Sequence, residues 1–224
     1  MISFRTEKHQ FIIDHCREKK VLDIGCVNHT LEATTRPEWL HGKLREVAKS
    51  LVGLDYEETI VKKLQDKGWN IIVSDAQNFN ITKKYPLGFD VIVVSDVIEH
   101  LVNPGAFLSC VRKHLAPGGI LLLTTPHAYG LAFFLEVVLL GEENINDDHT
   151  MTFSRKNIYW LLEKCGLQVK EFYWLIQDSS KSQTGLWEKL QRRMLFFLQY
   201  LVAKVRVEFS KEMIVIAMDK PTKK

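Results

Sequence analysis

The sequence predicts an α/β fold, a Rossmann-like doubly wound and mostly parallel seven-stranded sheet with helices on both faces. Short apolar runs alternate with stretches of helical period through five repeats, as expected of strands joined by crossover helices. The run Phe89–Ser95 is largely apolar at successive positions, which is typical of a parallel strand covered from both sides. The length of 224 residues suits one sizeable core rather than two. We therefore interpret residues 1–224 as a single domain.

Local signals delimit the expected elements in chain order. Residues 1–19 have apolar positions interleaved with polar ones and predict a leading helix. Gly68 and Gly166 are helix stops, and Ser154 is an N-cap candidate. The expected strands cover residues 21–25, 51–54, 70–74, 89–95, 120–125, 167–175 and 213–218. The expected helices between them cover residues 38–50, 57–67, 103–116 and 154–165.

Composition narrows the class of protein. Apolar residues make up 46% and charged residues 25% of the chain, which is a globular balance, and the net charge of +3 is too small to favour a nucleic-acid partner. The four cysteines are widely spaced without a CxxC pair, so we expect reduced thiols and a cytoplasmic location. The first residues lack the apolar region of a secretory signal, and no stretch is long and apolar enough to predict a spanning helix.

Polar residues at the carboxyl ends of the predicted strands form an adenosine-binding pattern. Ligands of such sheets bind beyond these strand ends. Asp55 ends the second strand and can accept hydrogen bonds from ribose hydroxyls, and the Tyr56 ring can lie against adenine. Asp75 ends the third strand, where its carboxylate can accept from the adenine amine while the Ala76 N–H donates to the ring. Gly25 lets the backbone approach the ligand.

A dinucleotide cofactor is disfavoured by the loop after the first strand. A pyrophosphate requires G-x-G-x-x-G at this place, but the second and third positions are Val27 and Thr30. A cofactor without phosphates therefore fits better.

At this point the sequence resembles the class I S-adenosylmethionine-dependent methyltransferases of the small-molecule or glycan type. The resemblance lies, in chain order, on VLDIGC (21–26), VGLDY (52–56), Asp75-Ala76, FDVIVVSDVIEHLVNPGAFL (89–108), LAPGGILLLTTPH (115–127) and DDHTMTFSRKNIYWLLEKCGLQV (147–169). It implies S-adenosylmethionine as the cofactor. The cofactor-binding residues that it implies are Gly25 and Cys26 by the methionine, Asp55 by the ribose, Asp75 and Ala76 by the adenine, and Ser95 by the sulfonium. We add Asp23 and Tyr56 to the cofactor-binding set. The sequence departs from the family at Val27, where a second glycine is usual, so the methionine carboxylate is expected to be held differently.

An oxygen acceptor usually needs a base to take its proton. His100, His127 and His149 follow predicted strand ends or the linker before the late helix, and each is a candidate, with a capping or packing role as the alternative. Asp96, Glu99 and His100 form a D-x-x-E-H set similar to a segment with a metal role in ubiquinone-biosynthesis O-methyltransferases. Because the same residues are common in methyltransferases that need no metal, we treat this set as a weak metal candidate and expect no divalent metal.

Two segments depart from the usual pattern. Residues 128–150 include the apolar run 131–140 and are predicted to cover the acceptor site as a lid. Residues 178–210 are predicted to form a basic amphipathic helical insertion before the last strand. Its apolar residues fall on one helical face: Leu186, Leu190, Met194, Phe197, Leu198, Leu201, Val202 and Val205. We expect residues 186–205 to pack on the domain or to form a homodimer, in preference to contact with a membrane surface.

The resulting hypothesis is methyl transfer from S-adenosylmethionine to a small-molecule or glycan acceptor, at oxygen. Alternatives are a methyltransferase of a protein or lipid-linked substrate and a non-catalytic module that binds the same cofactor. A nucleic-acid methyltransferase is disfavoured because Ser95-Asp96-Val97-Ile98 stands where an N-P-P-Y-like motif is often found.

Overall fold

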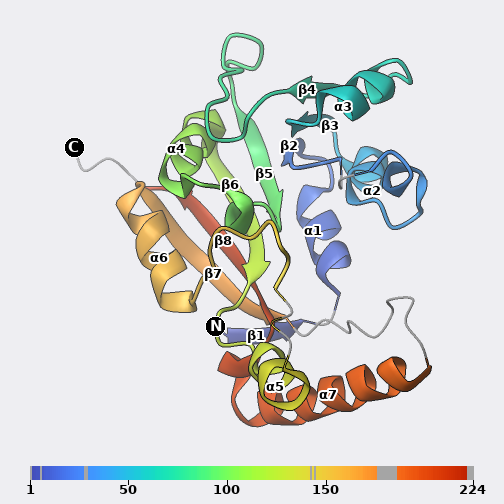
Figure 1. Cartoon of the computed structure of the whole chain (residues 1–224). Helices are drawn as coiled ribbons and strands as arrows, with labels where there is room; N and C mark the ends of the chain where they lie inside the picture. The colour runs from blue at the N-terminus through green and yellow to red at the C-terminus, as the bar shows by residue number, and fades with distance from the viewer. Residues whose placement is uncertain are drawn as a thin grey trace.

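A single mixed sheet forms the centre of the molecule. The structure, a computed structural model, describes residues 2–5, 7–27, 30–141, 143, 145–175 and 186–220. Its strands follow the order β1-β7-β8-β6-β5-β2-β3-β4. Only β8 runs antiparallel to its two neighbours, β6 and β7 (Figure 1). The predicted Rossmann-like fold class is confirmed, and β1 adds an eighth strand at one edge.

The elements lie close to the expected positions. The strands after β1 are β2 (Lys20–Ile24), β3 (Ser50–Asp55), β4 (Ile71–Val73), β5 (Phe89–Ser95), β6 (Leu115–Pro126), β7 (Leu167–Leu175) and β8 (Glu212–Asp219). The helices between them are α2 (Leu40–Val47), α3 (Glu58–Gln65), α4 (Pro104–His114) and α6 (Arg155–Lys164). Short 3₁₀ turns span Ala33–Thr35, Ile98–His100 and Val207–Phe209. The strand β6 begins before the predicted residue 120 because Leu115 already pairs with Phe89 of β5, ahead of a register shift.

The predicted leading helix is wrong at its start. Residues 2–5 form the strand β1 (Ile2–Arg5), which pairs in parallel with β7, and only α1 (Lys8–Cys16) is helical. The edge of β7 offers unpaired backbone groups, and pairing satisfies them. A pattern within the first residues cannot reveal this distant partner.

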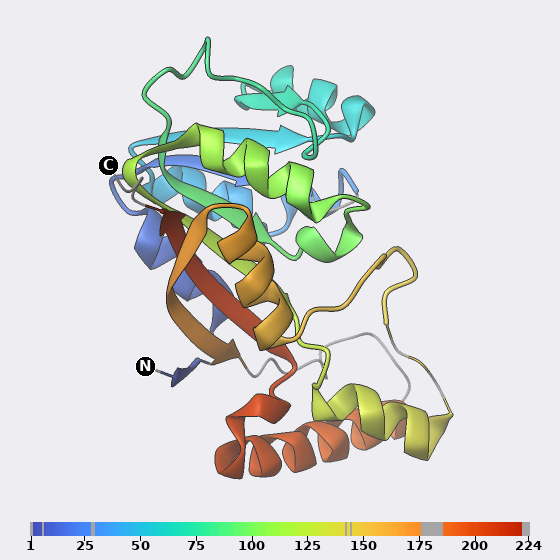
Figure 2. The ribbon, with the colours of Figure 1, turned by 90° about the vertical axis from the view of Figure 1, so that its left-hand side faces the viewer.

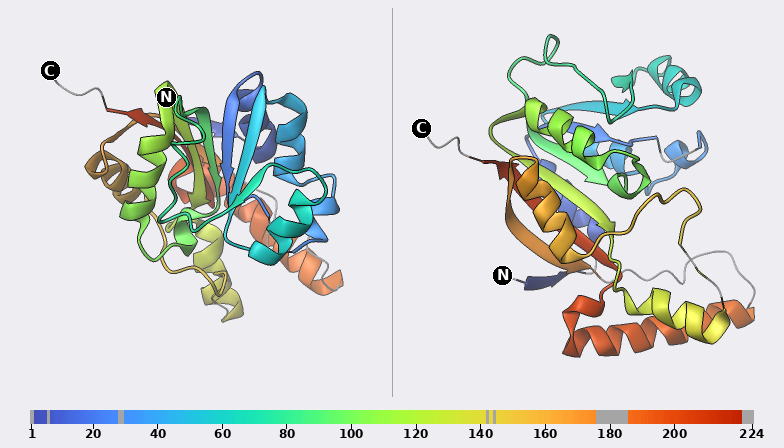
Figure 3. Two further views of the ribbon diagram at one scale, coloured as in Figure 1. Left: turned by 90° about the horizontal axis from the view of Figure 1, so that it is seen from above. Right: turned by 60° about the vertical axis from the view of Figure 1, so that its left-hand side comes forward.

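Helices cover both faces of the sheet, as predicted. Figure 3 shows α4 and α6 on one side of the sheet and α1 and α2 on the other. Buried side chains of α4 and α6 pack on Leu22, Ile92 and Leu121. On the opposite face, α1 and α2 pack on alternate residues of the same strands, including Val21 and Val93. The central strands are therefore buried from both sides, and their carboxyl ends form a rigid edge.

Two further helices lie side by side beyond this layered core, where Figure 2 shows them together. They are α5 (Leu131–Leu140) and α7 (Leu186–Val205). Residues 178–185 of the predicted insertion, and the side chains of Leu186 and Leu190, lie outside the described residues. No helix in the described part of the chain combines the length and hydropathy needed to cross a bilayer.

Candidate functional site

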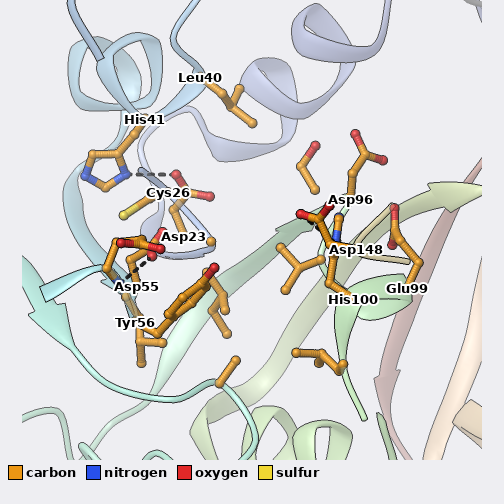
Figure 4. Close-up of a pocket in the computed structure, with 18 of the residues that line it drawn as sticks. Asp23, Cys26, Leu40, His41, Asp55, Tyr56, Asp96, Glu99, His100 and Asp148 are labelled. Carbon is orange, nitrogen blue, oxygen red and sulfur yellow. Dashed lines mark hydrogen bonds and ion pairs between the residues drawn. The ribbon is translucent and has the colours of Figure 1, made fainter. Parts of the chain in front are cut away.

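A cavity of about 740 Å³ lies at the carboxyl ends of the parallel strands. Figure 4 shows Asp55 and Tyr56 on one side of it, and Asp96, Glu99 and His100 opposite them. All predicted cofactor-binding residues line this cavity: Asp23, Gly25, Cys26, Asp55, Tyr56, Asp75, Ala76 and Ser95. The strand order explains this, because β2, β3, β4 and β5 are neighbours and end at the same edge.

The Asp55 carboxylate organises the loop after β2. It is buried, and its Oδ2 accepts a hydrogen bond from the Val27 N–H at 2.9 Å. Its Oδ1 accepts from the Glu57 N–H at 3.1 Å. A carboxylate has about four acceptor sites, so capacity for a ligand remains on each oxygen. Asp55 therefore both fixes the loop and presents acceptors to the cavity.

The loop that lacks the second glycine is held by other contacts. Gly25 has φ +77°, and a Cβ there would lie 2.4 Å from Cγ2 of Val97, so only glycine fits. The Trp39 indole N–H donates to the Cys26 carbonyl at 2.7 Å. These contacts, with that from Asp55 to Val27, hold the loop in place.

Asp23 has a structural partner that the sequence did not indicate. It is buried, and its Oδ2 lies 2.8 Å from Nδ1 of His41 at the start of α2. Burial also raises the pKa of the neighbouring Cys26 thiol well above its usual value, so this thiol is neutral. Asp23 and Cys26 thus shape the cavity wall rather than supply a reactive group.

The open end of the cavity, on the same side as Asp55, is formed by Asp75, Ala76 and Tyr56. Asp75 Oδ1 accepts from the Gln77 N–H at 2.8 Å, and the side chain is exposed at the cavity. The Tyr56 side chain is 69% exposed, so its ring is available to a planar ligand.

The opposite half contains a charged cluster. Asp96 is ion-paired with Lys8 of α1, and its Oδ1 accepts from the Thr124 hydroxyl at 2.8 Å. Lys8 Nζ also lies 3.1 Å from Oε2 of Glu212 at the start of β8. Asp96 has φ +54°, a conformation that non-glycine residues rarely adopt, and these contacts hold it there.

The charged groups of this cluster shift one another's pKa values. Burial alone would raise the pKa of Asp96, but the Lys8 ammonium and the hydrogen bonds lower it on balance. Burial alone would lower the pKa of Lys8, and the carboxylates of Asp96 and Glu212 reverse this, so Lys8 stays charged. For Glu212, burial and the nearby Asp96 raise the pKa despite Lys8.

The weak candidate set for a metal, Asp96, Glu99 and His100, is only partly brought together. Asp96 is bound to an ammonium, which repels a second cation. Glu99 and His100 instead lie with His149, and one ligand atom of each falls within 4.8 Å of the others. Glu99 is buried, its Oε2 accepts from the Thr125 hydroxyl at 3.0 Å, and Oε1 has no partner among the described residues. Burial, with Asp96 nearby, raises the pKa of Glu99 to about 8.

Two of the three candidate histidines line the cavity. The rings of His100 and His149 are 4.6 Å apart and nearly perpendicular, and His100 Nδ1 lies 4.0 Å from Oδ2 of Asp148. Burial and the neighbouring His100 lower the pKa of His149, so this imidazole is neutral at pH 7.

His127 does not line the cavity. The prediction that it is a candidate base is therefore corrected. It is 1% exposed and stacks edge-on against Trp174. Burial lowers its pKa to about 4, so it stays neutral inside the core. The strand end that it follows continues past the cavity toward α5, and the adjacent Pro126 lines the wall instead.

The predicted lid is divided between two positions. Asn146, Asp148 and His149 line the cavity, whereas the described residues of α5 do not. Sequence reasoning also missed several residues around the cavity, namely Lys8, His9, His41, Asp148 and Glu212. Of these residues, only Asp148 could have been predicted from the sequence, because it is adjacent to the candidate His149 in the segment 147–169.

Comparisons with known proteins agree with this geometry. A family model described as "Methyltransferase domain" matches residues 5–171. The ubiquinone biosynthesis O-methyltransferase of Rickettsia canadensis is 23% identical over 187 residues, covering 80% of this chain and 75% of that protein. The human mitochondrial enzyme of the same name is 26% identical over 201 residues, and the match covers 84% of this chain but only 51% of the human protein.

Solved structures share the fold. A SAM-dependent methyltransferase from Archaeoglobus fulgidus matches with a TM-score of 0.60 and 18% identity, covering 93% of this chain and 90% of that chain. A methyltransferase from Clostridium acetobutylicum matches with a TM-score of 0.59 and 12% identity, covering 95% of this chain and 91% of that chain.

Proposed function

This chain belongs to the methyltransferase domain family and uses S-adenosylmethionine, and we propose that it methylates an oxygen of a small-molecule or glycan acceptor. The observation that carries the proposal is the acidic cavity at the strand ends. Its lining includes the carboxylates of Asp55 and Asp75, and no lysine or arginine among the described lining residues. Such a field attracts a cationic sulfonium and repels a pyrophosphate.

The residues present fit the cofactor. Asp55 accepts from the ribose hydroxyls, and Asp75 with the Ala76 N–H binds adenine beneath the Tyr56 ring. Gly25, Cys26 and Asp23 border the methionine portion, and Ser95 borders the sulfonium. When bound, the cofactor supplies an activated methyl group, and the protein's main task is to align the acceptor with it. The cavity volume lies in the range typical of sites for ligands of this size.

In this proposal, His100 takes the proton of the acceptor hydroxyl. Its ring lines the half of the cavity opposite Asp55, and Asp148 near its Nδ1 stabilises the imidazolium that forms. The methyl carbon would leave the cofactor's sulfur as it bonds to the acceptor oxygen, so that the sulfonium would become a neutral thioether. His100 would take the proton of the acceptor hydroxyl. The names of the similar O-methyltransferases support oxygen as the acceptor atom. Protein or lipid-linked acceptors, and a non-catalytic binding role, remain the alternatives.

Cofactor binding is tested first by calorimetry. S-adenosylhomocysteine should bind and NADH should not, and Asp55→Ala should weaken S-adenosylhomocysteine binding by about 1.5–3 kcal/mol because it removes charge-assisted hydrogen bonds. Asp66→Ala, at an exposed aspartate after α3, is the matched control and should bind normally. Binding of NADH in place of S-adenosylhomocysteine would refute the proposal. Normal affinity in a folded Asp55→Ala protein would place the ribose elsewhere.

Methyl transfer should need no divalent metal, because Lys8 neutralises Asp96, one of the three residues of the weak candidate set. After dialysis against EDTA, transfer of labelled methyl to a panel of catechol, phenol and monosaccharide acceptors should be unchanged. A loss that Mg²⁺ or Mn²⁺ restores would contradict this and would assign a metal to Glu99, His100 and His149.

We also place the protein in a reducing, cytoplasmic compartment. Its cysteines, Cys16, Cys26, Cys110 and Cys165, are free thiols, which supports this location.

A further inference from the structure

Among the described side chains of α5 and α7, two polar ones are buried and most large apolar ones are exposed. Glu136 of α5 and Gln199 of α7 are 6% and 2% exposed, beside the small residues Ala132 and Ala203. Oε2 of Glu136 and Nε2 of Gln199 have no hydrogen-bond partner among the described residues. In water, a helix pair normally buries its apolar side chains and exposes its polar ones. Here polar side chains are buried although their hydrogen-bonding capacity is not fully met.

Most of the described large apolar side chains of these helices are exposed instead. Those of α5 and α7 that are more than 40% exposed are Phe134, Val137, Val138, Leu139, Met194, Phe197, Leu198, Leu201 and Val205. We call this set the outer face. Most of the described residues in the apolar stripe predicted for α7 belong to it, so the described part of the domain leaves that stripe uncovered. An exposed apolar patch that extends over two adjacent helices is typical of an interaction surface.

Basic residues accompany the outer face. Arg193, Lys204 and Arg206 are exposed on or next to α7. In the sequence from residue 181 to residue 207, six lysines and arginines stand against one acidic residue, Glu188. Apolar side chains flanked by basic ones suit an anionic lipid surface, where the chains enter the acyl boundary and the cations meet headgroups. A second copy of this chain would bring the same positive charge to the contact.

Both helices are connected to the cavity wall. The chain enters α5 soon after Pro126 and leaves it shortly before Asn146, and both residues line the cavity. After α7 the chain reaches Glu212, which also lines it. Figures 1 and 2 show the two helices at the same end of the molecule as the carboxyl ends of β6 and β7. A surface that docks here lies beside the cavity rather than behind the sheet.

We propose that the outer face of α5 and α7 docks on an anionic membrane surface. The helices lie in the plane of the interface, with Phe197 and Leu201 among the inserted side chains and the basic residues at headgroup level. The consequence for the reaction is access to amphiphilic acceptors held in the bilayer, but docking itself does not depend on the proposed function.

Vesicle flotation tests the proposal on the full chain. The wild type should bind vesicles of phosphatidylcholine and phosphatidylglycerol at three to one, and bind pure phosphatidylcholine much less. Added salt should release it, because screening weakens the attraction of the basic residues. Phe197→Glu with Leu201→Glu should lower the partition coefficient by about tenfold or more, since two large apolar side chains no longer insert.

A matched variant separates insertion from net charge. Leu87→Glu with Val102→Glu adds the same charge at residues that are 71% and 79% exposed outside the outer face, and it should keep most of the binding. Equal losses in both variants would overturn the proposal. Failure of the folded wild-type protein to bind anionic vesicles would also overturn the proposal. A dimer in light scattering that only the Phe197 and Leu201 variant dissociates would show that a second copy covers the face instead. Calorimetry with S-adenosylhomocysteine on the same samples reports separately on the proposed function.

Discussion

Replacing His100 by glutamine should lower kcat for oxygen methylation by about 10²- to 10⁴-fold, the usual contribution of a positioned general base. Glutamine approximates the size and polarity of the imidazole but cannot accept the acceptor's proton. Because His100 lies across the cavity from Asp55, the affinity for S-adenosylhomocysteine should not change. The measurements are transfer of labelled methyl to the best acceptor of the panel and calorimetry on the same protein.

The pH profile distinguishes a base from a positioning residue. The deficit of His100→Gln should shrink as the pH approaches the pKa of the acceptor hydroxyl, because the ionised acceptor no longer needs a base. His15→Gln on α1 is the control and should have normal activity, since His15 does not line the cavity and its Nδ1 lies 2.8 Å from the Phe11 carbonyl oxygen of its own helix. If His100→Gln is fully active and His149→Gln is not, the base is the neighbouring imidazole and our assignment is wrong.

Lys8→Met should destabilise the fold by about 3 kcal/mol, near the low end for breaking a buried ion pair. The Lys8 and Glu212 side chains are 9% and 13% exposed, but Asp96 is 35% exposed, so water compensates part of the loss there. The variant leaves both carboxyl groups without their ammonium and removes the contact that holds Asp96 at positive φ. Urea unfolding measures the free energy of unfolding. As a control, Lys19→Met, at an exposed lysine, should not lower the free energy of unfolding by a comparable amount.

The cost of Lys8→Met should depend on pH. In the wild type, the lowered pKa of Asp96 contributes stability above its ordinary pKa, and this contribution is lost as the pH falls through the lowered value. In the variant the folded-state pKa values of Asp96 and Glu212 rise, so stability is lost as the pH rises through them. The difference between the two proteins should therefore be larger above the raised carboxyl pKa values of the variant than below them. A difference that is small, or that does not vary with pH, would show that Lys8 is not the stabilising partner.

The local sequence determined the layered fold and which strand ends line the cavity. Strand and helix periodicities are properties of short segments, and parallel strands bring their carboxyl ends to one edge whatever the side chains between them. For this reason Asp55 and Asp75 could be predicted to lie together although they are separated along the chain. Position after a strand end was the only information needed.

Tertiary structure decided the rest, because burial and ion pairing depend on partners that are distant in sequence. Lys8 and Asp96 are 88 positions apart, and no local pattern links them. His100 and His127 look alike as residues that follow strand ends, but only the packing against Trp174 removes His127 from the cavity. In α7 the period showed an apolar stripe, yet only the contacts of α5 and α7 decided that Gln199 faces inward and Phe197 faces out. A helical period fixes which residues share a face, and the folded chain determines what that face meets.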